Sequence, residues 1–279
     1  MSARQIRIYT SFIFLGLVCL LWSLNQAQKY LQVSFLDVGQ GDAILLRTTQ
    51  GVNILVDGGP DNSLLYQLAD QLPWWERRID YLFITHWDDD HYVGAIQLLK
   101  KYQVKHIFAS YLPDKANANY TAWQRTLEQE SIAVQILKKG EKINIDNQLR
   151  GVVLSASQAD KLANNAKSLV VRWSYGDVDF LLTGDLPAEQ EAEILSSVYV
   201  LDSEVLKVGH HGSKYSSSAD FLAKVKPELC IIEVGANNKF GHPSKDALDR
   251  LQKAACDIRQ TKDFGTITVL SDGQSWRIK

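Results

Sequence analysis

Short runs of apolar residues, each closed by a turn that contains glycine, follow one another after residue 30. The runs LQVSFLDV, DAILLRT and VNILVDG cover residues 31–38, 42–48 and 52–58. Runs of this length bounded by glycine are typical of β-strands. We therefore predict that the folded part of the chain begins with a meander of three strands.

After the meander, predicted strands alternate with predicted helices. The strands cover 79–85, 104–110, 150–156, 168–174, 177–183, 205–209 and 229–235, and the helices cover 62–72, 93–102, 118–130, 187–196, 218–225 and 244–255. The scheme of meander and alternation occurs twice, which predicts an α/β fold of two sheets packed face to face with helices outside. A closing hairpin is expected at 266–270 and 275–279. No linker interrupts residues 31–279, so we expect one large domain there.

The N-terminal pattern differs from the rest. Residues 8–24 read IYTSFIFLGLVCLLWSL without a charge, and Arg4 and Arg7 precede them. Seventeen residues span roughly 25 Å as a helix, slightly short of a hydrocarbon core of about 30 Å. We expect residues 1–28 to be a retained signal anchor with one N-terminal transmembrane helix. The alternative is a cleaved signal peptide, but no convincing cleavage site follows the run.

The charges on either side of the apolar run predict its orientation in the membrane. The two arginines before the run outweigh Lys29 after it, which places the N-terminus in the cytoplasm and the domain on the extracytoplasmic side. If the segment were cleaved, the domain would be secreted.

Composition narrows the function classes. With 46% apolar and 22% charged residues the chain is not disordered. Thirty Lys and Arg against 32 Asp and Glu give a net charge of −2, so bulk positive charge does not hold a nucleic acid and any such contact must be local. The cysteines at 19, 230 and 256 fit neither a disulfide framework nor a metal knuckle, and we expect three buried thiols.

The strongest chemical signal is the run His86-Trp87-Asp88-Asp89-Asp90-His91, between a predicted strand and a predicted helix. Three neighbouring carboxylates repel one another, so an ordered loop of this kind favours a bound cation. Imidazole and carboxylate together suit Zn²⁺, Mn²⁺ or iron. The alternative is a solvated acidic loop that caps the following helix.

Other polar residues also follow apolar strands. Asp57, Asp185, the pair His210-His211 and His242 each come after such a strand, where sheet proteins place their sites. Together with His86 and His91, five of the six histidines lie at the ends of predicted strands, and His106 alone lies elsewhere. Coincidence explains such a distribution poorly.

Six motifs in order resemble the metallo-β-lactamase superfamily, and within it the extracellular hydrolase domain of ComEC-type competence proteins. They are FLDVGQGDAILL, ILVDGGP, THWDDDHYVGA, NNAKSLVVRWSYGDVDFLLTGDL, LKVGHHGSKYSSS and NKFGHPSKDAL. The polytopic channel of those proteins is missing, so we expect a stand-alone relative.

This resemblance implies an αββα sandwich that binds two divalent metal ions, Mn²⁺ or Zn²⁺, with Mg²⁺ as a further candidate. The first ion is expected at His86 and Asp88, and the second at Asp90 and His91, with Asp185 bridging the two. One histidine of the 210/211 pair completes the second site; the spacing to glycine favours His211, but the pair is ambiguous.

Two positions depart from the superfamily pattern. Asp88 replaces the usual second histidine of the first motif, and Asn164-Asn165 stand where another histidine is usual. Both changes enrich the first site in oxygen, which shifts its preference from Zn²⁺ toward Mn²⁺ or Mg²⁺.

Further residues receive roles next to the ligands. Asp57 is expected to orient a ligand or the nucleophile. His242, and whichever of His210 and His211 is not a ligand, are candidates for protonating the leaving oxygen. Lys214 is expected to contact a phosphate, although a solvated surface lysine is an equal alternative. The resemblance places Gln40-Gly41-Asp42 near the metals, but we assign no reaction role to this turn.

These expectations describe a membrane-anchored phosphodiesterase or nuclease that acts on DNA in a competence-related role. Its expected partners are the lipid bilayer through residues 8–24, DNA or another phosphodiester, and competence or DNA-uptake proteins. Trp87, Tyr92, Tyr215 and Phe240 are candidates for stacking on bases. One alternative is a hydrolase of small esters, lactones or thioesters, and another is a non-catalytic anchored partner of an uptake machine.

Overall fold

The chain is described by a computed structural model. It covers residues 5, 9–16, 18, 28–113, 117–159 and 161–279. Residues 9–16 are helical. Among the described residues, no helix has the length and apolar character needed to cross a membrane. Part of the expected anchor, residues 8, 17 and 19–24, lies outside the described residues, so the membrane anchor stays a prediction.

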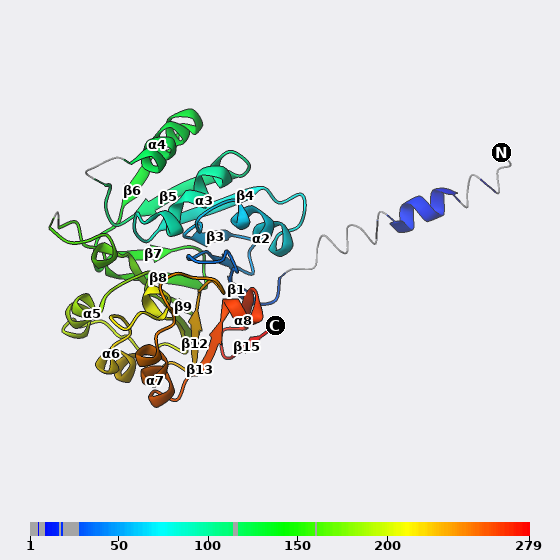
Figure 1. Ribbon diagram of the computed structural model, residues 1–279. Helices are drawn as coiled ribbons and strands as arrows, with labels where there is room; N and C mark the ends of the chain where they lie inside the picture. The colour runs from blue at the N-terminus through cyan, green and yellow to red at the C-terminus, as the bar shows by residue number, and fades with distance from the viewer. Residues whose placement is uncertain (1–4, 6–8, 17, 19–27, 114–116, 160) are drawn as a thin grey trace.

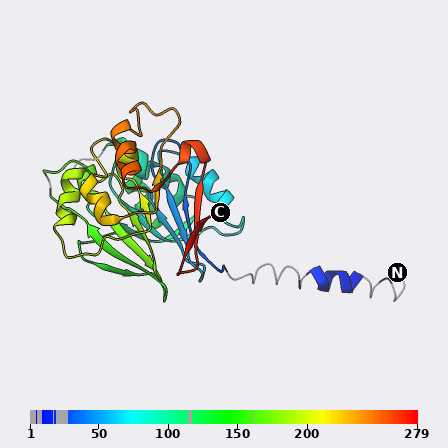
Figure 2. The ribbon, with the colours of Figure 1, turned by 90° about the horizontal axis from the view of Figure 1, so that it is seen from below.

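The first sheet contains eight strands in the order β15-β14-β1-β2-β3-β4-β5-β6 (Figure 1). Their bounds are β1 Leu31–Phe35, β2 Ile44–Arg47, β3 Asn53–Val56, β4 Arg78–Ile84, β5 Gln103–Ala109, β6 Val134–Ile136, β14 Ile267–Ser271 and β15 Trp276–Ile278. The predicted meander is confirmed, because β2 pairs antiparallel with both β1 and β3. The C-terminal hairpin lies beside β1, as Figure 2 shows, so the two ends of the fold meet in one sheet.

The second sheet contains seven strands in the order β13-β12-β11-β10-β9-β8-β7. Their bounds are β7 Lys142–Asn144, β8 Leu149–Ser155, β9 Val170–Tyr175, β10 Val178–Leu182, β11 Val205–Lys207, β12 Leu229–Ile232 and β13 Asp257–Gln260. Strands β10 to β13 run parallel, so their carboxyl ends meet at one edge.

An apolar layer joins the two sheets face to face. Phe35 of β1 and Phe83 of β4 face Trp173 of β9 and Phe180 of β10 within one buried cluster. The rings of Phe83 and Trp173 meet edge to face, with centroids 5.4 Å apart. Because strand side chains alternate between faces, the same strands bury their other residues under the helices.

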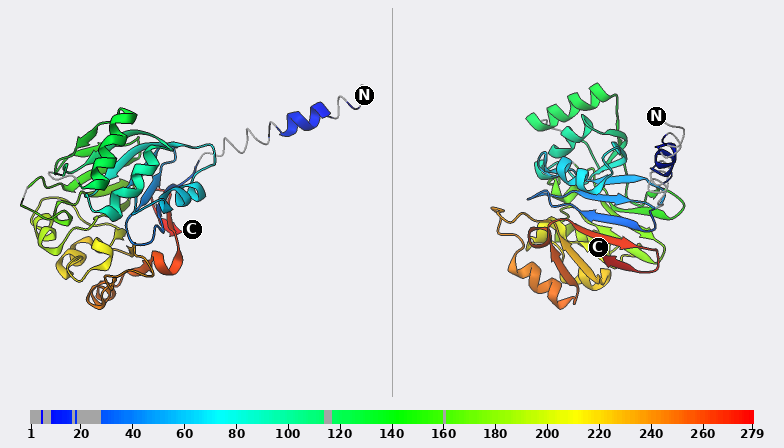
Figure 3. Two further views of the ribbon diagram at one scale, coloured as in Figure 1. Left: turned by 45° about the horizontal axis from the view of Figure 1, so that its top comes forward. Right: turned by 90° about the vertical axis from the view of Figure 1, so that its right-hand side faces the viewer.

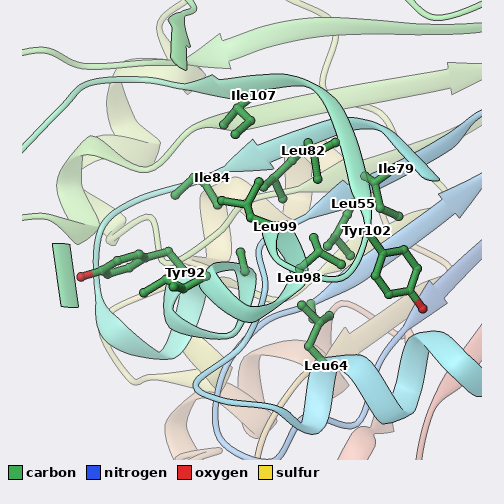
Figure 4. Close-up of a cluster of buried hydrophobic side chains, with 14 of the residues drawn as sticks. Leu55, Leu64, Ile79, Leu82, Ile84, Tyr92, Leu98, Leu99, Tyr102 and Ile107 are labelled. Atoms are coloured by element: carbon green, nitrogen blue, oxygen red, sulfur yellow. The ribbon is translucent and has the colours of Figure 1, made fainter. Parts of the chain in front are cut away.

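The helices cover the outer faces, which gives the four layers visible in Figure 3. The first sheet carries α2 Ser63–Gln71, α3 Asp89–Leu99 and α4 Ala118–Glu130, and the second sheet is covered by α5 Ala188–Leu195, α6 Ala219–Val225 and α7 Lys245–Lys253. Figure 4 shows Leu64 of α2 and Leu98 and Leu99 of α3 against Leu55 and Leu82 of the sheet. The αββα arrangement expected from the sequence is therefore confirmed.

One helix begins earlier than expected, and several short elements were not predicted. Helix α3 begins at Asp89 rather than at residue 93, so the acidic run forms its first turn instead of a loop. The short strands β6, β7 and β13 and the four-residue helix α8, Thr261–Phe264, have too few residues for a clear pattern.

The expectation of three buried thiols was also wrong. Cys230 and Cys256 form a disulfide, with their Cα atoms 5.9 Å apart. It joins β12 to the residue before β13, two segments that parallel pairing brings side by side. Cys19 lies outside the described residues.

Candidate metal centre

The polar residues singled out in the sequence gather at one edge of the sandwich. Strands β3, β4, β10 and β11 all end there, and each is followed by candidate residues. These are Asp57 after β3, His86 after β4, Asp185 after β10, and His210 and His211 after β11. Parallel strands in both sheets bring their carboxyl ends together, so residues distant in sequence become neighbours.

The first turn of α3 determines the direction of each acidic side chain in residues 88–90. Asp88 occupies the N-cap position, and Asp89 and Asp90 follow in the first turn, where the positive end of the helix dipole favours carboxylates. Asp89 is exposed and accepts a hydrogen bond from Asn119 Nδ2 at 2.8 Å. Asp90 faces the opposite way, with Oδ2 3.4 Å from His211 Nε2. Of these two adjacent acids, the geometry therefore brings only Asp90 to the other candidates.

A tight left-handed turn presents the histidine pair. His210 has φ 49° and His211 has φ 52°, and Gly212 continues the turn at φ 80°. Such a conformation costs about 1–3 kcal/mol for a residue with a side chain. The cost is offset by the packing of His211, which is buried, while His210 remains 31% exposed.

Four side chains converge on a small volume at this edge. Asp185 Oδ2 lies 3.5 Å from His91 Nε2 and 3.5 Å from His211 Nε2. Asp90 adds Oδ1 at 4.0 Å from His91 Nε2. A tetrahedral ion with ligand bonds of about 2.1 Å needs ligand atoms about 3.4 Å apart. The spacing of these nitrogen and oxygen atoms therefore matches a divalent ion between them.

The other ring nitrogens are already engaged, which fixes the tautomers. His91 Nδ1 lies 2.8 Å from Asp57 Oδ2, and His211 Nδ1 lies 2.8 Å from the Glu233 carbonyl oxygen. Asp57 is itself held by the Thr85 N–H and hydroxyl, at 2.8 and 2.6 Å. These contacts leave Nε2 of both histidines free to bind a cation.

His86 and Asp88 form a second group beside the first. His86 Nε2 lies 3.6 Å from Asp88 Oδ2, and the rings of His86 and His91 have centroids 4.0 Å apart. Asn164 Nδ2 donates to Asp88 Oδ1 at 2.7 Å, while the Asn164 oxygen accepts from Tyr111. Asn164 thus holds Asp88 in place, and its own oxygen is occupied.

A buried lysine stands behind the cluster. Lys207 forms an ion pair with Asp42 and donates to the Gly184 carbonyl oxygen at 3.0 Å. Burial opposes the ionisation of Asp42, but Lys207, His91 and His211 outweigh it and lower the Asp42 pKa to about 2. Asp42 also lies 3.3 Å from His211 Nδ1, so its carboxylate faces the backs of the imidazoles.

The electrostatics of the cluster favour positive charge at the imidazoles. Burial lowers the pKa of His211, but Asp185 and Asp42 more than compensate and raise it to about 10. For His91, the same carboxylates and Asp57 raise the pKa well above its usual value against the effect of burial. Protons and a metal cation therefore compete for the imidazole nitrogens of this site.

Unpartnered atoms provide a test of whether these residues fit a metal. The Nε2 atoms of His86, His91 and His211 are buried and have no hydrogen-bond partner among the described residues. Buried nitrogens without partners are costly. All three face carboxylates. Nitrogen and oxygen donors of this kind suit divalent ions, so the residues present fit a divalent metal ion.

The remaining candidates lie at different distances. His210 Nε2 is 3.7 Å from Asp185 Oδ2, and the ring of His242 lies 5.7 Å from that of His210. Burial lowers the pKa of both histidines. The ammonium of Lys214 instead lies over the exposed Tyr215 ring, 4.8 Å from its centroid, and no described contact brings it to the cluster. Its role toward phosphate stays a prediction.

Sequence reasoning missed two charged residues and left a third without a role. Lys207 and Glu233 are fully buried in or beside adjacent strands, and Asp42 lies in the turn to which no role was assigned. A usable signal existed, because a lysine in VLKVG and a glutamate in IIEVG are each a single charge in an apolar run.

Comparisons with known proteins agree with this geometry. The metallo-beta-lactamase superfamily matches residues 36–232. ComE operon protein 3 of Bacillus subtilis is 31% identical over 85% of this chain and 32% of its own length. Competence protein ComA of Neisseria gonorrhoeae is 30% identical over 84% of this chain and 31% of its own length, and recombination protein 2 of Haemophilus influenzae is 30% identical over 85% and 28%. The chain thus spans about a third of the length of these relatives.

Solved structures share the fold at low identity. The metallo-beta-lactamase fold protein YhfI of Bacillus subtilis has a TM-score of 0.57 at 10% identity and covers 86% of this chain and 100% of its own. A diphosphatase of the PhnP family has a TM-score of 0.51 at 12% identity and covers 87% and 99%. These structures show the shared fold, and the match over residues 36–232 shows the family: this chain belongs to the metallo-beta-lactamase superfamily.

Proposed function

We propose that the chain is a metal-dependent phosphodiesterase that acts on DNA. The observation that carries the proposal is the set of three buried, unpartnered imidazole nitrogens that face the carboxylates of Asp88, Asp90 and Asp185. The relatives named as competence and recombination proteins favour a DNA substrate over other phosphodiesters.

Two ions are assigned to the residues of this edge. His86 and Asp88 would hold the first, and Asp90, His91 and His211 the second. Asp185 would contact both, since its Oδ2 faces the imidazoles. We assign His211 rather than His210 to the second ion, because its Nε2 is buried, without a partner and 3.4 Å from Asp90.

Divalent ions supply a Lewis-acid charge that makes water nucleophilic at neutral pH and offsets the negative charge of an attacked phosphate. The chain fixes where this charge sits: Asp57 holds His91, and the Glu233 carbonyl holds His211. Asn164 holds Asp88. In the group of His86 and Asp88, one donor is an imidazole nitrogen and the others are carboxylate oxygens. We therefore propose Mn²⁺ as the preferred first ion, ahead of Zn²⁺.

Exposed aromatic side chains near the centre support a nucleic-acid substrate. Tyr215 is 66% exposed and stacks with Lys214, and Phe240 is 68% exposed and stacks on His242 at 5.9 Å. Exposed aromatic rings suit the bases of a single strand, and a lysine such as Lys214 suits its phosphates. Trp87 and Tyr92 do not serve this purpose, since both are buried in the core around α3.

We place the domain on the extracytoplasmic side of a membrane. The uncharged run at residues 8–24, preceded by Arg4 and Arg7, supports this location. So does the Cys230–Cys256 disulfide, because such bonds persist mainly in oxidising compartments.

The chain offers a matched pair of variants for a test. Asp90→Asn removes an expected ligand, whereas Asp89→Asn makes the same change one residue away on a carboxylate that points elsewhere. With Mn²⁺ we expect the full chain to cleave single-stranded DNA and bis-p-nitrophenyl phosphate. Asp90→Asn should lose at least about 100-fold in rate, the upper end of what residues that only support ligands cost, and Asp89→Asn should lose little.

The other outcomes reject parts of the proposal. Hydrolysis of a lactone or thioester without any phosphodiester cleavage would replace the substrate class. No metal-dependent turnover of any substrate would favour a non-catalytic partner of an uptake machine.

A further inference from the structure

The edge of the domain opposite the metal centre exposes aromatic and basic side chains. Strand β1 runs in the same direction as β4, because β2 is antiparallel to both β1 and β3, and β3 is parallel to β4. Leu31, where β1 begins, and Arg78, where β4 begins, therefore lie at the edge where the chain enters the domain. The seven residues of β4 separate this edge from His86 by roughly 23 Å.

Two hydrogen bonds connect the entry point to the end of α2. Gln28 Nε2 donates to the Arg47 carbonyl oxygen at 2.8 Å, and Arg47 Nη1 donates to the Gln71 carbonyl oxygen at 3.1 Å. Figure 1 shows α2 beside β1 at this side of the domain. The segment after α2 therefore lies close to the point where residues 8–24 connect to the domain.

This segment exposes two tryptophans. Trp74 is 79% exposed and Trp75 is 53% exposed, and their rings meet edge to face with centroids 5.6 Å apart. Neighbouring exposed tryptophans on a folded domain are unusual and mark an interaction surface. Tryptophan is also the side chain that concentrates where a bilayer meets water.

Basic side chains surround the tryptophans. Arg77 is exposed and donates to the Tyr102 hydroxyl at 2.7 Å, which places it beside the exposed Lys100 and Lys101 at the end of α3. The nearby acid Asp80 is already paired, with Lys105 at 2.7 Å and Arg78 at 3.3 Å. Glu76 lies between Trp75 and Arg77 in the chain, so the three basic side chains of Arg77, Lys100 and Lys101 stand against one further acid. The surface thus carries a net positive charge, which suits anionic headgroups.

The tether between this surface and the uncharged run is short. Only residues 25–27 separate Leu24 from Gln28. Four chain steps extend at most about 14 Å. If residues 8–24 lie in a bilayer, this edge of the domain cannot lie far from its surface.

We propose that the surface formed by Trp74, Trp75, Arg77, Lys100 and Lys101 rests in the headgroup region of the bilayer that holds residues 8–24. The tryptophans enter the interface and the basic groups contact lipid phosphates. The metal centre then faces away from the membrane, open to a substrate from solution. The proposal does not depend on which reaction the centre performs.

Quenching of tryptophan fluorescence by brominated lipids tests this contact in the full chain bound to vesicles of phosphatidylcholine and phosphatidylglycerol. Trp22→Phe first removes the tryptophan within the run. We expect this variant to float with the vesicles and its fluorescence to be quenched. The triple variant Trp22→Phe/Trp74→Phe/Trp75→Phe should float equally but lose most of the quenching. Adding Tyr215→Trp to the triple variant, at the metal-centre edge, should not restore it.

A charge reversal gives a second, independent readout. Lys100→Glu/Lys101→Glu should reduce the quenching, whereas Lys239→Glu/Lys245→Glu, on exposed lysines near the metal centre, should not. Equal quenching with and without Trp74 and Trp75, or failure of the Trp22→Phe chain to float with vesicles, would overturn the proposal. Quenching of Tyr215→Trp would overturn the orientation.

Discussion

Lys207 and Asp185 divide the two oxygens of one carboxylate between separate tasks. Lys207 Nζ lies 3.6 Å from Asp185 Oδ1, while Oδ2 faces the imidazoles of His91, His210 and His211 at 3.5, 3.7 and 3.5 Å. A cation that belongs to the protein thus holds one oxygen, and the other is presented to the expected metal ions.

Removing this lysine should destabilise the metal-free protein. Lys207→Met breaks the buried ion pairs of Lys207 with Asp42 and Asp185, and removing one partner of a buried pair costs about 3–5 kcal/mol. Urea unfolding in EDTA measures the loss, and Lys207→Met/Asp42→Asn should recover part of it.

The control for this experiment is an exposed ion pair. Lys226→Met breaks a pair with Asp202 in which both side chains are more than half exposed, so it should change the stability by less than about 1 kcal/mol. Equal effects of Lys207→Met and Lys226→Met would contradict the role given to the buried lysine.

Asp57 is expected to act on metal affinity through His91. Asp57→Asn keeps the shape and tolerates the observed φ of 61°, but it replaces the carboxylate that binds His91 Nδ1. We expect the affinity for Mn²⁺ to fall about 10- to 100-fold, measured by calorimetry. Asp61→Asn, on a nearby exposed acid, should bind as the unmodified chain does; an unchanged affinity in Asp57→Asn would remove this residue from the centre.

The predictable part of the site came from residues that end apolar strands. His86, Asp185 and the 210/211 pair each follow a recognisable strand, and parallel strands bring their ends to one edge. The family resemblance selected Asp90 rather than Asp89, but the residues alone do not give the direction of a side chain, because it depends on local turns. In the structure, the first turn of α3 directs Asp90 inward and Asp89 outward.

Gly41 and Gly39 offer a test of backbone packing around the centre. A Cβ at Gly41 would overlap the Asp90 carbonyl oxygen, whereas a Cβ at Gly39 would meet nothing within 4 Å, although both residues have positive φ. Gly39→Ala should cost about 1 kcal/mol of stability. Gly41→Ala should cost about 1–3 kcal/mol more and also weaken Mn²⁺ binding, because Asp90 must move. Equal melting temperatures and affinities for the two variants would show that this contact is unimportant.

Reduction of the disulfide should lower stability. The Cys230–Cys256 bond closes a loop with a sequence separation of 26, for which chain entropy gives about 3.5 kcal/mol. Urea unfolding with and without dithiothreitol measures the difference. Identical midpoints, with thiol counting that shows complete reduction, would contradict a stabilising role.

The parts that sequence reasoning missed depend on neighbours across the fold. Cys230 and Cys256 are brought together by the pairing of β12 with β13, and β13 itself was not predicted. Lys207 and Glu233 belong to adjacent strand segments of the second sheet. Burial and the neighbouring Asp42 raise the pKa of Glu233 well above its usual value, so the charge of Lys207 is balanced by Asp42 and Asp185, which it meets only after folding. Single charges in apolar runs indicate such partners, but they do not say which partner it is.

We propose that these distant side chains together hold paired divalent ions. A crystal soaked in Mn²⁺ and measured at the manganese absorption edge tests it directly. We expect two anomalous peaks, one about 2.2 Å from Nε2 of both His91 and His211, and the other at a similar distance from His86 Nε2 and Asp88. Full Mn²⁺ occupancy elsewhere on the protein, with no peak among these residues, would contradict it.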